Sequence, residues 1–96
     1  MLQYLVIAYD GTDHEAADRR MKVRPSHFEM AKELKHHGRF ITGGAILNDE
    51  GKMIGSMMVV QFETEDDLAH WMRYEPYITG NVWQSIEVKP FRVAAV

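Results

Sequence analysis

The order of hydrophobic and polar residues along the chain predicts four strands. Strands are indicated where β-branched and aromatic residues gather in short runs that end at glycine, asparagine or aspartate. These runs cover residues 2–10, 39–47, 53–63 and 82–93, and residues 48–52 read as a turn. The second and third runs therefore form a hairpin.

A helix is predicted between the first two strands, in the segment RPSHFEMAKELKHHG. Pro25 suits the first position of this helix and Gly38 suits the position just beyond its end, with basic residues filling the last turn. The preceding residues 13–23 are charged and weakly patterned. We expect a loop or a loose helical turn there.

A second helix is predicted between the third and fourth strands. Thr64, followed three residues later by Asp67, resembles a capping box and marks the start of this helix. The helix runs to about Tyr74, because Pro76 cannot continue it.

The element order βαββαβ predicts a ferredoxin-like α+β fold, a single domain spanning residues 1–96. Right-handed crossovers place both helices on one face of a four-stranded antiparallel sheet. The two helices then run antiparallel, so the start of the first lies near the end of the second. Pro90, near the end of the fourth strand, indicates a sheet edge.

The first strand is apolar on both of its sides. One side carries Leu5 and Ile7, and the other carries Tyr4, Val6 and Ala8. The sheet face away from the helices has no cover within the chain, and monomers rarely expose an apolar patch of several hundred Å². We therefore expect a homodimer packed through the sheet faces.

Each predicted helix ends its apolar stripe in an ionisable residue. The first stripe consists of Met30, Ala31 and Leu34, and the second consists of Leu68, Trp71 and Met72. One step along the same faces leads to His27 in the first turn of one helix and to Glu75 at the end of the other. The predicted topology brings these two ends together.

The charge of each residue opposes the dipole of its own helix end, so the two would offset one another as a pair. A carboxylate that holds a histidine gives it a defined tautomer, which is the minimal equipment of a general acid or base. The alternative is a buried His–Glu pair with a structural role only. The pattern leaves both interpretations open, and a bound ligand is compatible with either.

Further polar residues gather at the same end of the predicted sheet. They are Asp10 at the end of the first strand, Ser56 early in the third, Arg24 just before the helix, and Tyr77 shortly after Glu75. Each has an ordinary structural explanation when taken alone. Together they predict a cavity for a small, anionic or phenolic molecule. The Gly43–Gly44 pair marks a bulge, a close backbone approach, or the place where a ligand lies against the sheet.

Composition argues against several classes of partner. The net charge is −3, with acidic and basic residues interspersed, so we expect no nucleic-acid partner. No apolar run approaches the roughly 20 residues of a membrane helix, and the first residues read as a strand instead of a signal peptide. We therefore expect a cytoplasmic protein with no membrane partner. The chain has no cysteine, and its histidines lack metal-site spacing, so we expect neither metal nor cofactor.

Several motifs resemble the YCII-related family of small proteins. They are RPSH at residues 24–27, GS at 55–56, EPY at 75–77 and PF at 90–91. The resemblance covers nearly the whole chain. It implies a fold similar to muconolactone isomerase, in which two sheets form a dimeric α+β barrel.

The resemblance also implies roles for the paired residues. The family's histidine in this motif and an aspartate before Pro-Tyr are regarded as a catalytic dyad, matched here by His27 and by Glu75, which is one methylene longer. Established reactions of relatives are few, and include dehydrochlorination of a hydroxylated aromatic compound.

Two functions are compatible with these features. In the first, His27 and Glu75 catalyse a lyase or isomerase reaction on a small cyclic or phenolic substrate, which Arg24, Asp10, Ser56 and Tyr77 help to bind. In the second, the same cavity belongs to a non-catalytic ligand-binding or accessory module.

Overall fold

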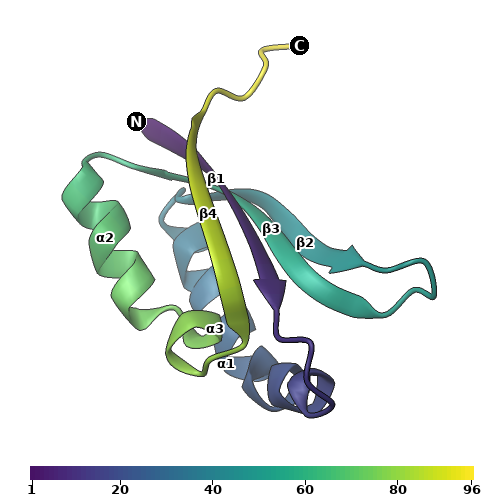
Figure 1. Ribbon diagram of the computed structural model, residues 1–96. Helices are drawn as coiled ribbons and strands as arrows, with labels where there is room; N and C mark the ends of the chain where they lie inside the picture. The colour runs from purple at the N-terminus through teal and green to yellow at the C-terminus, as the bar shows by residue number, and fades with distance from the viewer.

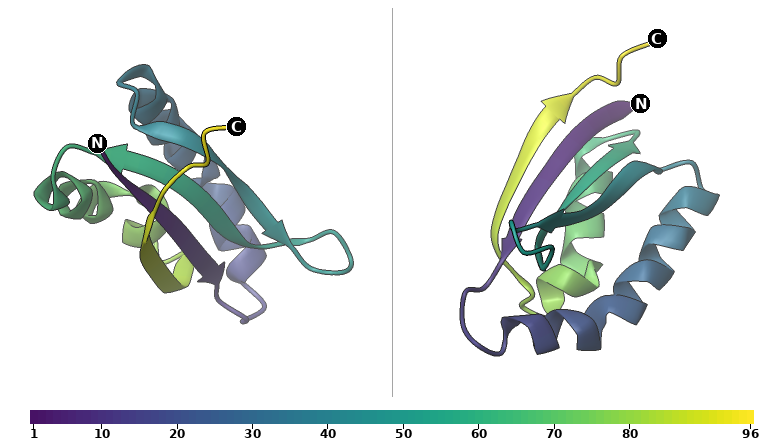
Figure 2. Two further views of the ribbon diagram at one scale, coloured as in Figure 1. Left: turned by 90° about the horizontal axis from the view of Figure 1, so that it is seen from above. Right: turned by 90° about the vertical axis from the view of Figure 1, so that its right-hand side faces the viewer.

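The computed structural model describes residues 1–96 as one antiparallel sheet with three helices on one of its faces (Figures 1 and 2). The strands are β1 (Leu2–Asp10), β2 (Phe40–Leu47), β3 (Met53–Phe62) and β4 (Trp83–Phe91). The helices are α1 (Ala16–His36), α2 (Glu65–Tyr74) and α3 (Pro76–Thr79). The strand order β2-β3-β1-β4 confirms the predicted ferredoxin-like α+β fold.

The alternation along β1 separates the two faces of the sheet as predicted. Tyr4, Val6 and Ala8 are buried beneath the helices, whereas Leu5 and Ile7 are half-buried on the opposite face. On the neighbouring strand β3, the residues that pair with these three, Val60, Met58 and Ser56, are also buried. The face away from the helices is less uniform on β3, because Val59 is buried there and Met57 is half-buried. The core therefore lies between the sheet and the helices. It consists of Tyr4, Val6, Ala8, Met58, Val60, Phe62, Trp71, Tyr77, Val82 and Trp83.

Helix α1 begins earlier than predicted, and residues 13–23 are mostly helical and do not form a loop. It starts at Ala16, so Pro25 lies inside the helix and not at its first position. Proline lacks an N–H group and crowds the carbonyl of the preceding turn, which bends a helix. The right-hand view of Figure 2 shows α1 changing direction along its length. Arg20 and His27, one from each side of the proline, are both buried and hold the two halves of the helix on the core.

The junction between α2 and α3 was only partly predicted. The Thr64 side chain caps α2 by accepting a hydrogen bond from the Asp67 amide at 3.1 Å, and the helix ends at Tyr74, as expected. The short helix α3 was not predicted. Pro76 occupies its first turn, and Glu75 is at once the C-cap of α2 and the N-cap of α3.

The strands end within two residues of their predicted limits, and β4 lies at the sheet edge, as Pro90 indicated. The register of β2 shifts on either side of Gly43–Gly44 and not at the pair itself. Gly43 does mark a close approach, because a Cβ atom there would lie 2.7 Å from the Met57 carbonyl oxygen. None of the three helices has both the length and the apolar character required to cross a membrane.

Gly55 on β3 has no room for a side chain. Its replacement therefore tests how closely β3 packs against β1. A methyl group there would overlap the backbone carbonyl of Ala8 on β1, so we expect Gly55→Ala to lower the free energy of unfolding by about 1–3 kcal/mol. Gly44→Ala on β2 is the control, since its methyl group would meet no atom within 4 Å. Chemical denaturation measures both. Equal stability of the two variants would contradict the close packing of β3 against β1.

Candidate functional site

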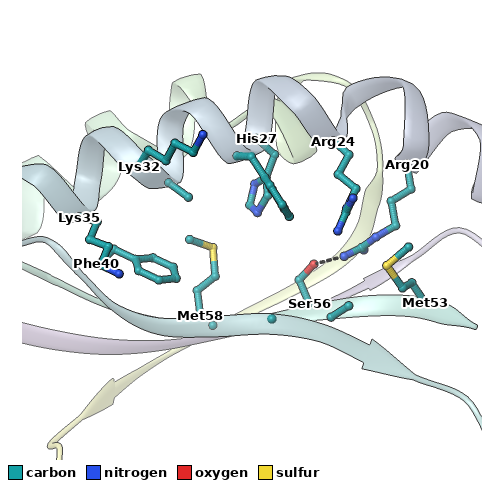
Figure 3. A pocket seen from close by; sticks show the side chains of 14 residues that line it. Arg20, Arg24, His27, Lys32, Lys35, Phe40, Met53, Ser56 and Met58 are labelled. Carbon is teal, nitrogen blue, oxygen red and sulfur yellow. Dashed lines mark hydrogen bonds between the residues drawn. The ribbon is translucent and has the colours of Figure 1, made fainter. Parts of the chain in front are cut away.

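A cavity of about 340 Å³ lies between α1 and the strands β2 and β3 (Figure 3). Its charged lining consists of Arg20, Arg24, Lys32 and Lys35, all from α1. Phe28, Phe40, Met53 and Met58 supply most of the apolar lining. No carboxylate lines the cavity, although the chain as a whole carries a net charge of −3. The cavity is therefore electropositive and suited to an anion.

His27 reaches into the space between α1 and the sheet, close to the middle of this cavity (Figure 3). Its Nδ1 atom is hydrogen-bonded to Oε1 of Glu75, whose side chain has no exposed surface. Because an ionised carboxylate can only accept, Nδ1 carries the proton and donates it in this bond. In the neutral imidazole, Nε2 then carries the free lone pair. The sequence thus correctly paired these two residues.

The reason given for the pair from sequence was wrong in one respect. His27 lies near the middle of α1 and not in its first turn, so the field of a helix end does not act on it. Glu75 also has a local partner, because its Oε1 accepts a hydrogen bond of 3.1 Å from the Tyr77 amide at the start of α3. The carboxylate at the end of α2 is therefore an N-cap as well as a partner of the histidine.

Aromatic rings fix the plane of the imidazole. The ring of Tyr77 stacks on His27 with 3.9 Å between centroids and 12° between planes, and Trp83 meets it edge-on at 6.0 Å. Tyr77 is fully buried and does not line the cavity. The structure thus gives Tyr77 contact with the histidine, whereas the sequence suggested contact with a ligand.

A second buried ion pair lies beside the first. Nη1 of Arg20 donates to both carboxylate oxygens of Asp10 at 3.1 Å, and Nη2 donates to Oγ of Ser56 at 3.0 Å. The same Oγ accepts a hydrogen bond of 3.1 Å from Nε1 of Trp83. Asp10 does not line the cavity, whereas Ser56 does. Asp10 therefore holds Arg20 and lies apart from any ligand.

Ser56 can act only as a donor towards the cavity. Its oxygen already accepts from Arg20 and from Trp83, which occupies both of its lone pairs. The hydroxyl hydrogen has no acceptor among the protein atoms, and Ser56 lines the cavity. An oxygen atom of a ligand would satisfy it.

Arg24 lines the cavity, as the sequence indicated, but from within α1 and not from the residue before the helix. Its guanidinium lies over the ring of Phe28 at 4.4 Å from the centroid. Arg24 takes part in no ion pair, so its charge is available to a ligand.

The sequence interpretation missed four residues of this region, Arg20, Lys32, Lys35 and Trp83. Arg20 precedes His27 by seven residues, which is two helical turns on the same face. That signal could have been found if residues 13–23 had been recognised as helical. No group of three or more His, Asp or Glu side chains is arranged to hold a metal ion.

Similarity to known proteins agrees with this fold. The model of the YCII-related domain matches residues 2–92. The chain belongs to the YCII-related family. Among its relatives, Protein YciI of Escherichia coli O6:H1 is 30% identical over 95 residues, which cover 93% of this chain and 95% of that protein. An uncharacterized protein of Haemophilus influenzae is 28% identical over 97 residues, covering 95% and 97% of the two chains.

Solved structures support the same fold. The 5-chloro-2-hydroxyhydroquinone dehydrochlorinase of Burkholderia phenoliruptrix AC1100, solved in complex with 2,5-dihydroxybenzoquinone, has a TM-score of 0.82 at 18% identity. The match covers 96% of this YCII-related chain and 95% of that enzyme. A dimeric ferredoxin-like protein of unknown function from Jannaschia sp. CCS1 has a TM-score of 0.60 at 15% identity, with 97% and 100% of the chains covered. At these identities, the similarities show the fold alone.

The buried phenol of Tyr77 predicts a loss of stability at alkaline pH. Burial raises the pKa of Tyr77 above its ordinary value of 10.0, because the phenolate would lose its hydration. The unfolded chain ionises first, so this contribution to stability is complete below about pH 10 and is lost as the pH rises through the pKa of the folded state. Denaturant titrations between about pH 8 and 11 should show a steeper alkaline loss for the wild type than for Tyr77→Phe. Parallel curves for the two proteins would contradict this.

Proposed function

We propose that this YCII-related protein is an enzyme in which His27 transfers a proton on a small anionic or phenolic compound without a cofactor. One observation carries the proposal. The imidazole is bonded through Nδ1 to a fully buried carboxylate, while the residue lines an electropositive cavity. A base whose tautomer is fixed, next to groups that stabilise negative charge, is the arrangement that removal of a proton from carbon requires.

The chemistry follows from these positions. Nε2 of His27 takes a proton from a saturated ring carbon next to a carbonyl, as in the keto tautomer of a phenol, and the electron pair left behind is delocalised onto the carbonyl oxygen as an enolate or phenolate. The Ser56 hydroxyl and the Arg24 guanidinium stabilise that oxygen. If a neighbouring carbon carries chlorine, the pair can instead form a double bond as chloride leaves; if not, the imidazolium can return the proton to another carbon.

The lyase reaction has support from the comparisons. The dehydrochlorinase from Burkholderia phenoliruptrix shares this fold over nearly its whole length. Its named substrate carries hydroxyl groups and a chlorine on one ring, which is a phenolic compound of the class expected for the electropositive cavity. The isomerase reaction uses the same base and the same anion site.

A second candidate is a module that binds such a molecule without converting it. The observation in its favour is that His27 and Glu75 complete each other as a buried pair, which needs no reaction to explain it. The two candidates differ in turnover. They share the cavity and its charge.

We also propose that the protein is a homodimer packed through the free face of its sheet. Leu5, Ile7 and Met57 lie half-buried on this face, on adjacent strands, and a second copy would cover them. The similar protein from Jannaschia is described as dimeric. A sheet-to-sheet dimer would leave the helices and the cavity on the outer side of each protomer.

Replacement of His27 tests the enzymatic proposal. With 5-chloro-2-hydroxyhydroquinone and its unchlorinated analogue as probes, we expect chloride release or carbon–deuterium exchange to fall about 10²–10⁴-fold in His27→Ala. In Glu75→Gln these rates should fall by less than in His27→Ala, because the amide oxygen can still accept a hydrogen bond from Nδ1 although it carries no charge. His70→Ala, a histidine exposed on α2, is the control. Unchanged rates in His27→Ala would exclude its catalytic role, and binding of the probes without turnover by the wild type would favour the binding module.

A charge on the free face of the sheet tests the dimer. Light scattering at micromolar concentration should give about twice the mass of the 11.1 kDa chain for the wild type and the monomer mass for Ile7→Lys. The new lysine would lie opposite Glu87 on β4, which favours the isolated sheet. Met21→Lys, at an exposed position on α1, should remain dimeric. A monomeric wild type would disprove the dimer.

A further inference from the structure

The cations of the cavity are distributed along α1 on both sides of His27. Towards the N-terminal end lie Arg24 and the buried Arg20, above Ser56 (Figure 3). Towards the C-terminal end lie Lys32 and Lys35, where Lys35 extends towards Phe40 on the sheet (Figure 3). The imidazole therefore lies between two separate positive regions.

Most of this positive charge has no partner in the protein. Arg20 is neutralised by Asp10. Arg24, Lys32 and Lys35 take part in none of the ion pairs of the chain, and no acidic side chain lines the cavity. Exposed lysines are often merely solvated, but these two border a cavity that is also lined by a buried histidine. An anion in the cavity would be attracted from both ends.

The opposite wall leaves room for a ligand along the whole row. The part of β2 that lines the cavity is Gly43–Ala45, which has the smallest side chains available. Phe40 lies at the end near Lys35, and Met53 lies near Arg20 and Ser56 (Figure 3). The space is therefore elongated along α1, with apolar walls and a positive charge at each end.

We propose that the cavity binds a dianion, an extended molecule with one anionic group at each end. Arg24 and Ser56 hold one group, Lys35 with Lys32 at the rim holds the other, and the middle of the molecule lies against His27. This assignment rests on the proposed function for its reacting centre and names the substrate class of that site. The anionic groups are carboxylates or ionised phenols, which share the same charge and acceptor geometry.

The spacing of the cations limits the length of the ligand. At 1.5 Å per residue, the backbone positions of Arg24 and Lys35 are about 16 Å apart, and both side chains are long enough to lean inwards. A chain of about six carbon atoms, or one benzene ring with a substituent at each end, fits between them and fits a cavity of about 340 Å³. A shorter dianion would reach only one of the two regions.

The two ends would serve different purposes. The end at Ser56 and Arg24 lies where charge develops during proton transfer, so it would stabilise the transition state. The lysine end contacts a group that does not change during the reaction, so it would bind substrate and transition state equally. Loss of Lys35 would therefore raise KM for dianionic substrates and leave kcat unchanged.

Two pairs of probes test the dianion site without any reaction. Calorimetric titration compares adipate with hexanoate and terephthalate with 4-methylbenzoate, because the members of each pair have the same number of carbon atoms and differ in one carboxylate. We expect the wild type to bind a dianion about fivefold more tightly than its monoanion at low salt, and the preference to shrink as salt is added. Lys35→Met should lose the preference while still binding the monoanions. Lys22→Met, at an exposed position on α1 away from the cavity, should keep it.

Two results would overturn the proposal. One is equal binding of dianions and monoanions by the wild type, and the other is a Lys35→Met variant that weakens both members of each pair equally. Neither result depends on turnover. A wild type that prefers dianions but shows the same turnover when His27 is replaced would retain the dianion site and lose the proposed catalytic role, so the two failures can be distinguished.

Discussion

The carboxylate of Glu75 has no exposed surface. The packing of α1 against the α2–α3 junction therefore depends on the hydrogen-bond donors that this carboxylate meets. A buried charge without a partner costs several kcal/mol. Oε1 receives both available hydrogen bonds, from the Tyr77 amide and from His27, whereas Oε2 has none. His27 therefore cannot turn away from Glu75 without leaving most of that charge unsatisfied. The position of the imidazole follows from a requirement of folding, and this fixes one ring nitrogen and frees the other.

The acidic and basic side chains around the site differ in how deeply they are buried. Asp10 and Glu75 are buried behind the cavity, where each is bonded to a residue of α1, and neither lines it. The cations Arg24, Lys32 and Lys35 are at least partly exposed and face the space in which a ligand would lie. The acids thereby hold the deep residues in place without repelling an anion. The long, solvated cations supply attraction at low cost, because they keep much of their hydration.

Much of the fold was predictable from local signals. The alternation of β1 and the Thr64 cap predicted real contacts, because each depends on residues close together in sequence. The start of α1 was missed because proline usually marks a helix start, whereas here tertiary contacts at Arg20 and His27 hold a bent helix together. His27 and Glu75 were paired correctly from the topology. The electrostatic reason given for the pair was wrong for His27, because α1 starts at Ala16 and His27 is therefore not at a helix end. The cations were missed because only the cavity reveals which of many charged residues face inwards.

The presence of glutamate at position 75, where the family resemblance led us to expect aspartate, can be judged from these contacts. The carboxylate has two tasks, to cap the short helix α3 through the Tyr77 amide and to hold an imidazole that comes from another helix. Aspartate is the stronger helix cap, because its short side chain folds back onto the next turn. Glutamate is less favoured as a cap, yet here a single oxygen makes both contacts. The longer side chain of glutamate therefore still reaches both partners, and the hydrogen-bonded link between α1 and α3 is kept.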